Sequence, residues 1–131
     1  MARLPADAAT PALKVSRVNY DPAGTDLRTN TMYNKETVTV TNTTGVARSL
    51  KGWTVRDMQN HVYTFGNVTV KARGSVVLHT GSGTNTATQL YWRQSNYVWN
   101  NTGDTAVLRN STRATVHSCK WTTLKPGYKI C

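Results

Sequence analysis

The residues of this sequence with the clearest capacity for chemistry are its basic side chains. The chain of 131 residues holds 16 Lys and Arg against 6 Asp and Glu, which gives a formal net charge of +10. A basic excess raises the rate of encounter with polyanions such as nucleic acid, teichoic acid or anionic lipid. The basic residues are scattered and form no run, which excludes a basic tail of the kind that binds nucleic acid. They serve either as ordinary solubilising charge or as a polyanion-binding surface.

Aromatic rings can add a stacking platform for bases or sugars to such a surface. The chain has six Tyr, four Trp and one Phe, and a small domain also needs large rings to fill its core. Tyr91 and Trp92 are adjacent, and adjacent side chains of a strand point to opposite faces, so we expect one of them to be exposed. Tyr97, close to Arg93 in the sequence, is the other candidate for an exposed ring. The rings that we expect in the core are Trp53, Phe65 and Trp99.

The acidic residues show no pattern typical of catalysis. Asp57 and Asp104 each lie in a polar turn, where an Asp side chain accepts hydrogen bonds from nearby backbone N–H groups. We predict a structural role for both. No closely spaced pair of acids follows Glu36, and the sequence contains no nucleophile elbow of the G-x-S-x-G type. We therefore expect a protein that is not an enzyme.

Metal ligation usually requires histidines, cysteines or acids at short spacing. His61, His79 and His117 are far apart, and no Cys-x-x-Cys accompanies them, so we interpret them as structural or surface residues. Asp21 and Asp26 lie in one loop and can supply oxygen ligands to calcium, but a plain turn accounts for them more simply. We expect no metal and no cofactor.

Short strands joined by turns must position these residues. Val and Thr are abundant, and β-branched residues suit pleated, half-buried strands. In the segment 36–41, Val38 and Val40 alternate with threonines, as expected for a strand with one buried face. Strands at this spacing favour a β-sandwich over alternating strands and helices, and no apolar run is long enough for a membrane helix. The predicted strands are 13–20, 36–41, 50–55, 62–65, 68–71, 75–79, 105–109 and 115–121.

The length of the chain suits one domain. Residues 1–12 are small and polar and lack the apolar stretch of a signal peptide. We interpret them as a disordered arm or as the remnant of a removed or truncated segment. Residues 13–131 form the predicted domain.

Four segments, in the same order along one domain length, resemble the lamin-tail domain in its bacterial form. The resemblance implies an all-β, immunoglobulin-like β-sandwich, a fold known in nuclear lamins and in bacterial secreted or surface proteins. It indicates the fold and not the ligand, because one fold can carry many functions. The segments are VSRVNYDPAGTD at 15–26, ETVTVTN at 36–42, the run 50–65 with GWTVRD and HVYTF, and the run 81–108 with YWRQSNYVWNNTGDTAVL.

Cys119 and Cys131 are the only cysteines of the chain. An even count fits a disulfide, although two free thiols in a reducing cell fit as well. The resemblance favours the disulfide, because bacterial relatives of this single-domain type are commonly exported. Such a bridge would pin the C-terminal tail to the last strand, and it would place the protein outside the cytoplasm, as a secreted protein whose signal peptide is not part of this sequence.

The function that follows is that of a non-enzymatic, secreted binding module. Its basic surface would take an anionic polymer, either nucleic acid such as DNA or a teichoic-acid-like polyanion of the cell wall. The resemblance places Arg56, Arg93 and Arg109 in its most characteristic segments, so they are the candidate ligand-binding arginines. The candidate ligand-binding rings are Tyr91, Trp92 and Tyr97.

The alternative function is protein–protein adhesion or assembly with another secreted or surface protein, through an edge or a face of a sheet. The threonine-rich strand 37–41 would be a usable edge if no other strand paired with it. The sequence leaves the choice between the two functions open, as it does the oligomeric state.

Overall fold

Strands account for most of the regular structure of this protein. The computed structural model describes residues 10–22, 27–123 and 125–131. Residues 1–9 of the predicted N-terminal arm and Asp26 of the loop considered for calcium lie outside them. The elements in chain order are β1 (Leu13–Asn19), α1 (Asn30–Tyr33), β2 (Thr37–Asn42), β3 (Arg48–Ser49), β4 (Thr54–Arg56), β5 (Val62–Thr64), β6 (Thr69–Val70), β7 (Ser75–His79), β8 (Gln89–Tyr91), β9 (Asp104–Arg109), β10 (Thr115–Trp121) and β11 (Tyr128–Ile130).

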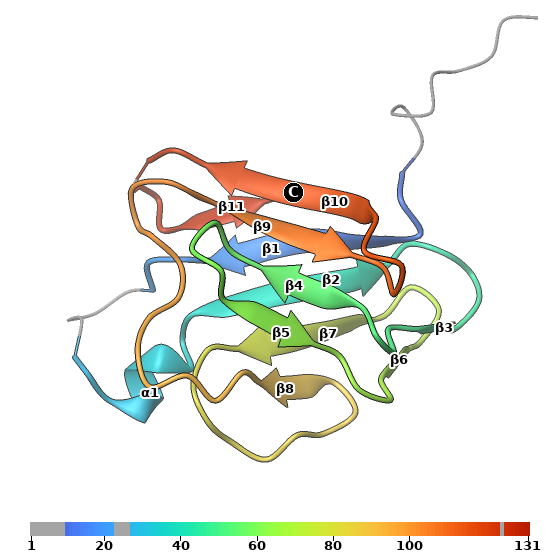
Figure 1. Ribbon diagram of the computed structural model, residues 1–131, viewed down its shortest axis with the longest axis horizontal. Coiled ribbons are helices and arrows are strands. Elements are labelled where there is room, and N and C mark those ends of the chain that lie inside the picture. The colour runs from blue at the N-terminus through green and yellow to red at the C-terminus, as the bar shows by residue number, and fades with distance from the viewer. Residues whose placement is uncertain (1–9, 23–26, 124) are drawn as a thin grey trace, which may run out of the picture.

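These strands form two layers (Figure 1). One sheet has the order β11-β1-β2-β7-β8, the other has the order β10-β9-β4-β5, and β3 pairs with β6 in a short ribbon. Neighbouring strands are antiparallel except β7 and β8, which are parallel. The all-β, immunoglobulin-like sandwich predicted from the sequence is confirmed. Among the described residues, no helix has the length and apolar character required to cross a bilayer.

The strand boundaries agree with the prediction best where apolar and polar residues alternate. β7 and β10 begin and end at the predicted residues, β1 and β9 differ by one residue at one end, and β2 is shifted by one residue at both ends. The predicted strand 50–55 is wrong, because the chain turns at Gly52, which has a φ of +77° that other residues rarely adopt. β3 lies before that turn and β4 after it.

The condition under which the segment 37–41 would be a usable edge, that no other strand pairs with it, is not met. β2 lies inside its sheet, with Val40 paired to Val15 of β1 on one side and to Val76 of β7 on the other. Both rows of its backbone hydrogen-bonding groups are therefore used within the sheet. The strands at the edges of the two sheets are β11 and β8, and β10 and β5.

Inward-facing aliphatic residues and a chain of rings fill the space between the sheets. Tyr20 stacks on Trp121 with ring centroids 4.6 Å apart. Trp121 contacts Trp99 edge to face, and Trp99 contacts Trp92 in the same way. Both sheets therefore share one core, which fixes the outer faces relative to one another. The buried aliphatic residues include Val15, Val18, Val38, Val40, Val55 and Leu108.

Candidate basic groove on the four-stranded sheet

A groove of about 310 Å³ lies on the outer face of the four-stranded sheet. Val55 of β4 and Leu108 of β9 are fully buried in the core. Because side chains of a strand alternate between its faces, Arg56 and Arg109 point away from the core. We call this depression the arginine groove; its lining residues are Thr54, Arg56, Val62, Thr64, Arg109 and Arg113.

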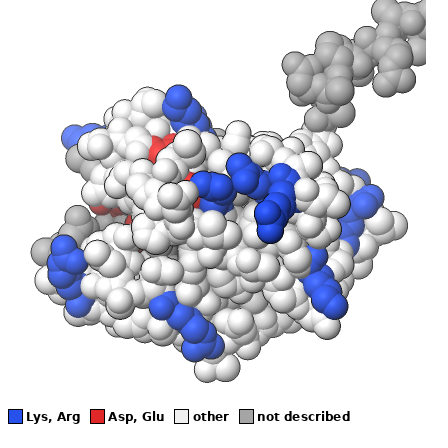
Figure 2. Space-filling view, in the orientation of Figure 1, with Lys and Arg blue, Asp and Glu red and all other residues white. Residues whose placement is uncertain are grey.

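The pairing of β4 with β9 brings two of its arginines together. Thr54 lies opposite Arg109, and Arg56 lies opposite Val107. The two arginines therefore occupy diagonal positions on neighbouring strands, where Cα atoms are roughly 7–8 Å apart and long side chains reach the same space. Figure 2 shows Lys and Arg side chains gathered over this part of the molecule.

A turn after β9 supplies the third arginine, Arg113. The Oδ1 atom of Asn110 accepts hydrogen bonds from the backbone N–H groups of Thr112 and Ala114, both at 3.0 Å. Arg113 has a φ of +67° in this turn, which directs the chain back toward the sheet. Arg113 was not among the arginines predicted from the sequence. The feature that could have indicated it is the polar turn from Asn110 to Arg113, which directly follows Arg109.

The arginines of the groove keep donors that the protein does not use. Arg56 donates to Oδ1 of Asn60 at 3.0 Å, and the buried Nε of Arg109 has no hydrogen-bond partner within the described structure. Neither these two side chains nor Arg113 forms an ion pair with a described carboxylate. An anionic ligand can pair with the parts of these guanidinium groups that reach the groove, since guanidinium groups match carboxylate and phosphate oxygens in pairs.

Asp57 holds the turn that follows Arg56. Its carboxylate is fully buried, and Oδ1 accepts from the backbone N–H groups of Gln59 at 3.0 Å and His61 at 2.8 Å. Oδ2 lies 2.5 Å from Nδ1 of His61. The negative charge is therefore engaged within the turn between β4 and β5, and the end of β4 that carries Arg56 is fixed.

Asp104 ties that same turn to the start of β9. Its Oδ1 accepts from the backbone N–H of Met58 at 3.2 Å, and its Oδ2 accepts from that of Asn100 at 3.1 Å. With its amide nitrogen turned toward the acids, Gln59 donates to Oδ2 of Asp104 at 3.1 Å and to Oδ2 of Asp57 at 3.2 Å. The two acids thus form one buried cluster that positions the neighbouring strands β4 and β9.

Arg93, the third candidate arginine, lies apart from the groove. Its backbone has a φ of +66°, and its N–H donates to the carbonyl of Gly81 at 2.9 Å, just beyond β8. Burial raises the pKa of Tyr63, and the nearby charge of Arg93 opposes that shift. Because Tyr63 packs against the core, Arg93 lies beside the inward side of β5 and not among the residues that line the outer face.

The three candidate rings do not join the arginines either. Trp92 must be removed from the ligand-binding candidates, since it is 8% exposed and belongs to the core. Tyr91, on the outer side of β8 in the other sheet, stacks on His79 with centroids 4.8 Å apart. Tyr97 donates to the carbonyl of Leu27 at 2.7 Å. The predicted combination of basic side chains with a stacking platform is therefore not assembled at the groove.

The remaining rings considered in the sequence lie in or against the core. Phe65 and Trp99 are 2% and 3% exposed. Trp53 is half-buried and packs against the same cluster. Among the described residues, no group of three His, Cys, Asp or Glu side chains is placed to hold a metal ion.

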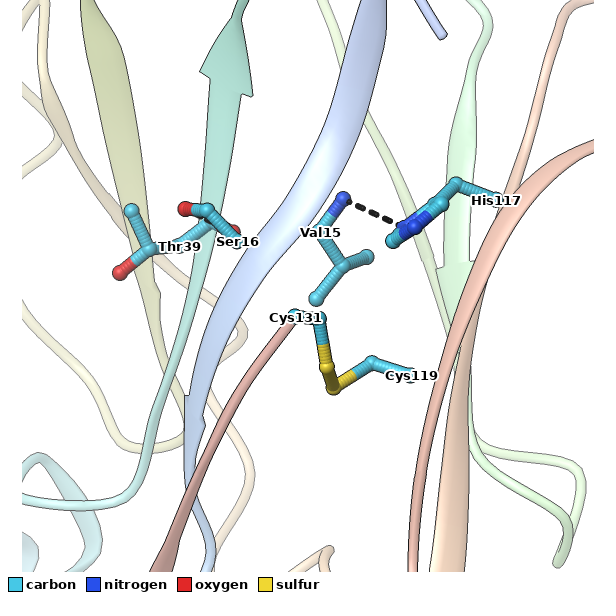
Figure 3. Close-up of a disulfide and its surroundings, with 6 residues drawn as sticks. All are labelled: Val15, Ser16, Thr39, His117, Cys119 and Cys131. Atoms are coloured by element: carbon cyan, nitrogen blue, oxygen red, sulfur yellow. Dashed lines mark hydrogen bonds between the residues drawn. A yellow bond between two sulfur atoms is a disulfide. The ribbon is translucent and has the colours of Figure 1, made fainter. Parts of the chain in front are cut away.

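The Cys119–Cys131 disulfide expected from the sequence is confirmed (Figure 3). It joins β10 to the residue after β11, with Cα atoms 5.9 Å apart, and so links the edges of the two sheets. Next to it, Nδ1 of His117 on β10 accepts a hydrogen bond from the backbone N–H of Val15 at 3.2 Å, where β1 has a bulge. Burial, aided by the charge of Lys14, lowers the pKa of His117.

A known protein family matches most of the chain. The sequence model of the family described as the Lamin Tail Domain matches residues 6–123. No curated protein matches the chain. The matched segment contains all three arginines of the groove.

Proposed function

The chain belongs to the lamin tail domain family, a family of binding and interaction domains and not of enzymes, and from this premise we propose that its arginine groove binds an anionic polymer. The ligand is of the polyphosphodiester type, as in nucleic acids and teichoic acids. One observation carries the proposal: Arg56, Arg109 and Arg113 converge on one sheet face without a carboxylate partner in the described structure.

The number of arginines favours a polymer over a small anion. Two of them come from the neighbouring strands β4 and β9 and a third from the turn after β9, so a ligand with several anionic groups can pair with more of them than a single ion can. Arginine forks pair with phosphate oxygens, and each neutralised phosphate releases counterions. Affinity should therefore fall steeply as salt concentration rises.

Export from the cytoplasm is part of the same proposal. Disulfides form and persist in oxidising compartments, and the Cys119–Cys131 bridge links the two sheets of this domain. Cell-wall polyanions and extracellular nucleic acid are the polymers that such a protein meets.

The test is a binding titration of fluorescent DNA and of poly(glycerol phosphate) at several salt concentrations. The double variant Arg56→Gln/Arg109→Gln should bind both polymers more weakly, and the slope of log affinity against log salt should fall by about 0.7–0.9 for each lost contact. The matched control is Arg28→Gln/Arg48→Gln. Each of these exposed arginines also donates to a neutral side chain, and neither lines the groove.

Two results would overturn the proposal. One is the absence of binding at low salt to either polymer. The other is an equal loss in the groove variant and in the control, because net charge alone would then explain the affinity. A preference for one polymer identifies the source of the phosphodiester.

The alternative, a protein partner that docks on a sheet edge, is favoured by the apolar surface around β5. Val62, on this edge strand, is 48% exposed, and Met58 in the preceding turn is 61% exposed. An added strand could pair with β5. Sedimentation over a range of concentrations, with Val62→Lys as the variant, tests self-association, and pull-downs test other partners. A monomer at all concentrations that captures no partner would count against this alternative.

A further inference from the structure

A second basic groove, of about 290 Å³, lies where β10 and β11 form the edges of the two sheets. It is close to the disulfide in the fold, since Cys119 precedes Lys120 on β10 and Cys131 follows β11. We call it the lysine groove; the residues that matter here are Lys120, Lys125, Lys129, Tyr20, Trp121 and Tyr128.

The floor of the lysine groove is formed by two stacked rings whose polar atoms already donate hydrogen bonds within the protein. The rings of Tyr20 and Trp121 are parallel within 7°. The hydroxyl of Tyr20 donates to the carbonyl of Thr123 at 2.8 Å, and Nε1 of Trp121 donates to that of Asn100 at 2.7 Å. The groups left to meet a ligand are therefore the lysine ammonium groups around the rim.

The charged side chains that line the lysine groove are lysines. Lys120, Lys125 and Lys129 are all exposed, and none forms an ion pair with a carboxylate in the described parts of the chain. Arg17 lies over the ring of Tyr128, with its guanidinium carbon 4.3 Å from the ring centroid. Asp21 lies beside the groove, where its backbone N–H donates to the carbonyl of Gly127 at 3.0 Å, and it lines a neighbouring depression.

Lys120 connects the two grooves. Cys119 and Trp121 are buried, so Lys120 between them points to the outer face of the four-stranded sheet. It lies opposite Thr105 of β9, and Arg109 lies four residues further along that strand. At 3.4 Å per residue along the strand, Thr105 is about 14 Å from Arg109, and Lys120 beside Thr105 lies at about the same distance from Arg109.

We propose that a single polymer chain runs from the arginine groove across β9 and β10 and turns into the lysine groove. This inference rests on the proposed function and narrows the ligand to a flexible, single-chain polyphosphodiester. The turn from a sheet face to the gap between two sheet edges excludes a duplex, whose persistence length is about 50 nm. The path from Arg109 to Lys120 is alone about 14 Å long, so the ligand must carry several phosphates to reach both grooves.

Fluorescent oligothymidylates, from a dinucleotide upward, test the path. Affinity for the unaltered protein should rise with length until the strand spans both grooves, and then level off. The triple variant Lys120→Gln/Lys125→Gln/Lys129→Gln should lose this gain, and its salt slope for long strands should fall by about 2. Its affinity for the dinucleotide and for duplex DNA should equal that of the unaltered protein.

The matched control is Lys35→Gln/Lys51→Gln/Lys71→Gln, which removes equal charge outside both grooves. Thermal melting of each variant verifies that the domain is folded. The inference is overturned if the two triple variants lose equal affinity, or if the lysine variant weakens binding of the dinucleotide and the long strand alike.

The failure of this inference can be distinguished from the failure of the proposed function. If Arg56→Gln/Arg109→Gln weakens binding at every length and the lysine variant has no effect, binding in the arginine groove is supported and binding in the lysine groove is refuted. If neither variant has an effect, both are refuted. Poly(glycerol phosphate) fractions of matched length, used in place of oligothymidylate, identify which polymer is bound.

Discussion

The outer faces of the two sheets are both polar, but their polar side chains differ in their partners. On the five-stranded sheet, the hydroxyl of Thr41 lies 2.7 Å from that of Ser16 and 2.7 Å from that of Ser75, which forms a ladder across three strands. Nδ2 of Asn19 donates to Thr37 at 3.0 Å. The polar groups of this face satisfy one another.

The four-stranded sheet presents the opposite case. Arg56 and Arg109 extend from it without carboxylate partners among the described residues, and the Nε of Arg109 has no partner there. What distinguishes the four-stranded face is the grouping of Arg56, Arg109 and Arg113 in one groove. An anionic ligand, as proposed above, would supply the negative charge that these arginines lack.

The largest effect is expected in the core that both faces share. Trp121→Ala removes the stack on Tyr20, the contact with Trp99 and the bond to the carbonyl of Asn100. It should lower the free energy of unfolding by about 3–5 kcal/mol, measured by urea denaturation. Trp121→Phe keeps a ring and should cost less. A small effect of the Ala variant would mean that the two faces do not depend on a common core.

The stability of the fold should depend on pH through two groups that act in opposite directions. The first is Glu36. Glu36, fully buried before β2, accepts from the hydroxyl of Thr80 and the N–H of Val98, each at 2.8 Å, and burial raises its pKa from 4.5 to about 7. The folded state therefore binds the extra proton. Its stabilisation is complete below about pH 4.5 and is lost as pH rises through about 7, by about 3 kcal/mol in total.

His117, on the four-stranded sheet, should act in the opposite direction. Its lowered pKa means that the unfolded state binds more protons, so its contribution is present above about pH 6.5 and is lost as pH falls. Urea denaturation between about pH 4.5 and 8 compares Glu36→Gln with His117→Asn. The first should make stability rise more steeply with pH, and the second should make it rise less. Changes of the same sign would contradict the assignment.

Removing the disulfide measures how much the covalent link between the two sheet edges contributes to stability. Cys119→Ser/Cys131→Ser should lower the free energy of unfolding by about 2–3 kcal/mol, because the closed loop is short. The loss should concentrate at β11, where hydrogen exchange should accelerate more than in β9. The reduced, unaltered protein is the control, since it removes the bond without changing the residues. Uniform acceleration over both strands would contradict this local role.

The smallest expected effects come from single substitutions on the two outer faces, and they compare the faces directly. Thr41→Val interrupts the hydroxyl ladder and should lower stability by about 1 kcal/mol without changing polymer affinity. Arg56→Gln should weaken polymer binding and change stability by about 0.5 kcal/mol or less. Urea denaturation and a salt titration of each variant measure both quantities. A binding defect in the Thr41 variant would show that the five-stranded face takes part in recognition.

Sequence patterns predicted the fold to the extent that residues interact locally. Alternation located β7 and β10 at their observed ends. α1, β3, β8 and β11 were missed, because elements of two to four residues carry no readable periodicity. β11 is defined by its pairing with β1, where Arg17 lies opposite Ile130. A short strand that forms only because it pairs with another strand leaves no recognisable pattern in its own sequence.

The residues of the candidate site were also only partly predictable from the sequence. Arg56 and Arg109 were selected from the segments that resemble the family, and the β4–β9 pairing places them side by side. Arg93 came from an equally characteristic segment but lies elsewhere, because its segment follows β8 of the other sheet. Arg113 depends on a turn whose direction only the folded chain defines.

The amino-acid sequence by itself determined the all-β class, the net positive charge and the cysteine pair, because these follow from composition and from alternation along single strands. The tertiary structure decided which charges meet. Strand order placed Arg56 beside Arg109, buried Trp92, and used both sides of β2 within its sheet. The physical reason is that sheet pairing joins segments distant in the chain, and no local pattern encodes which pairs form.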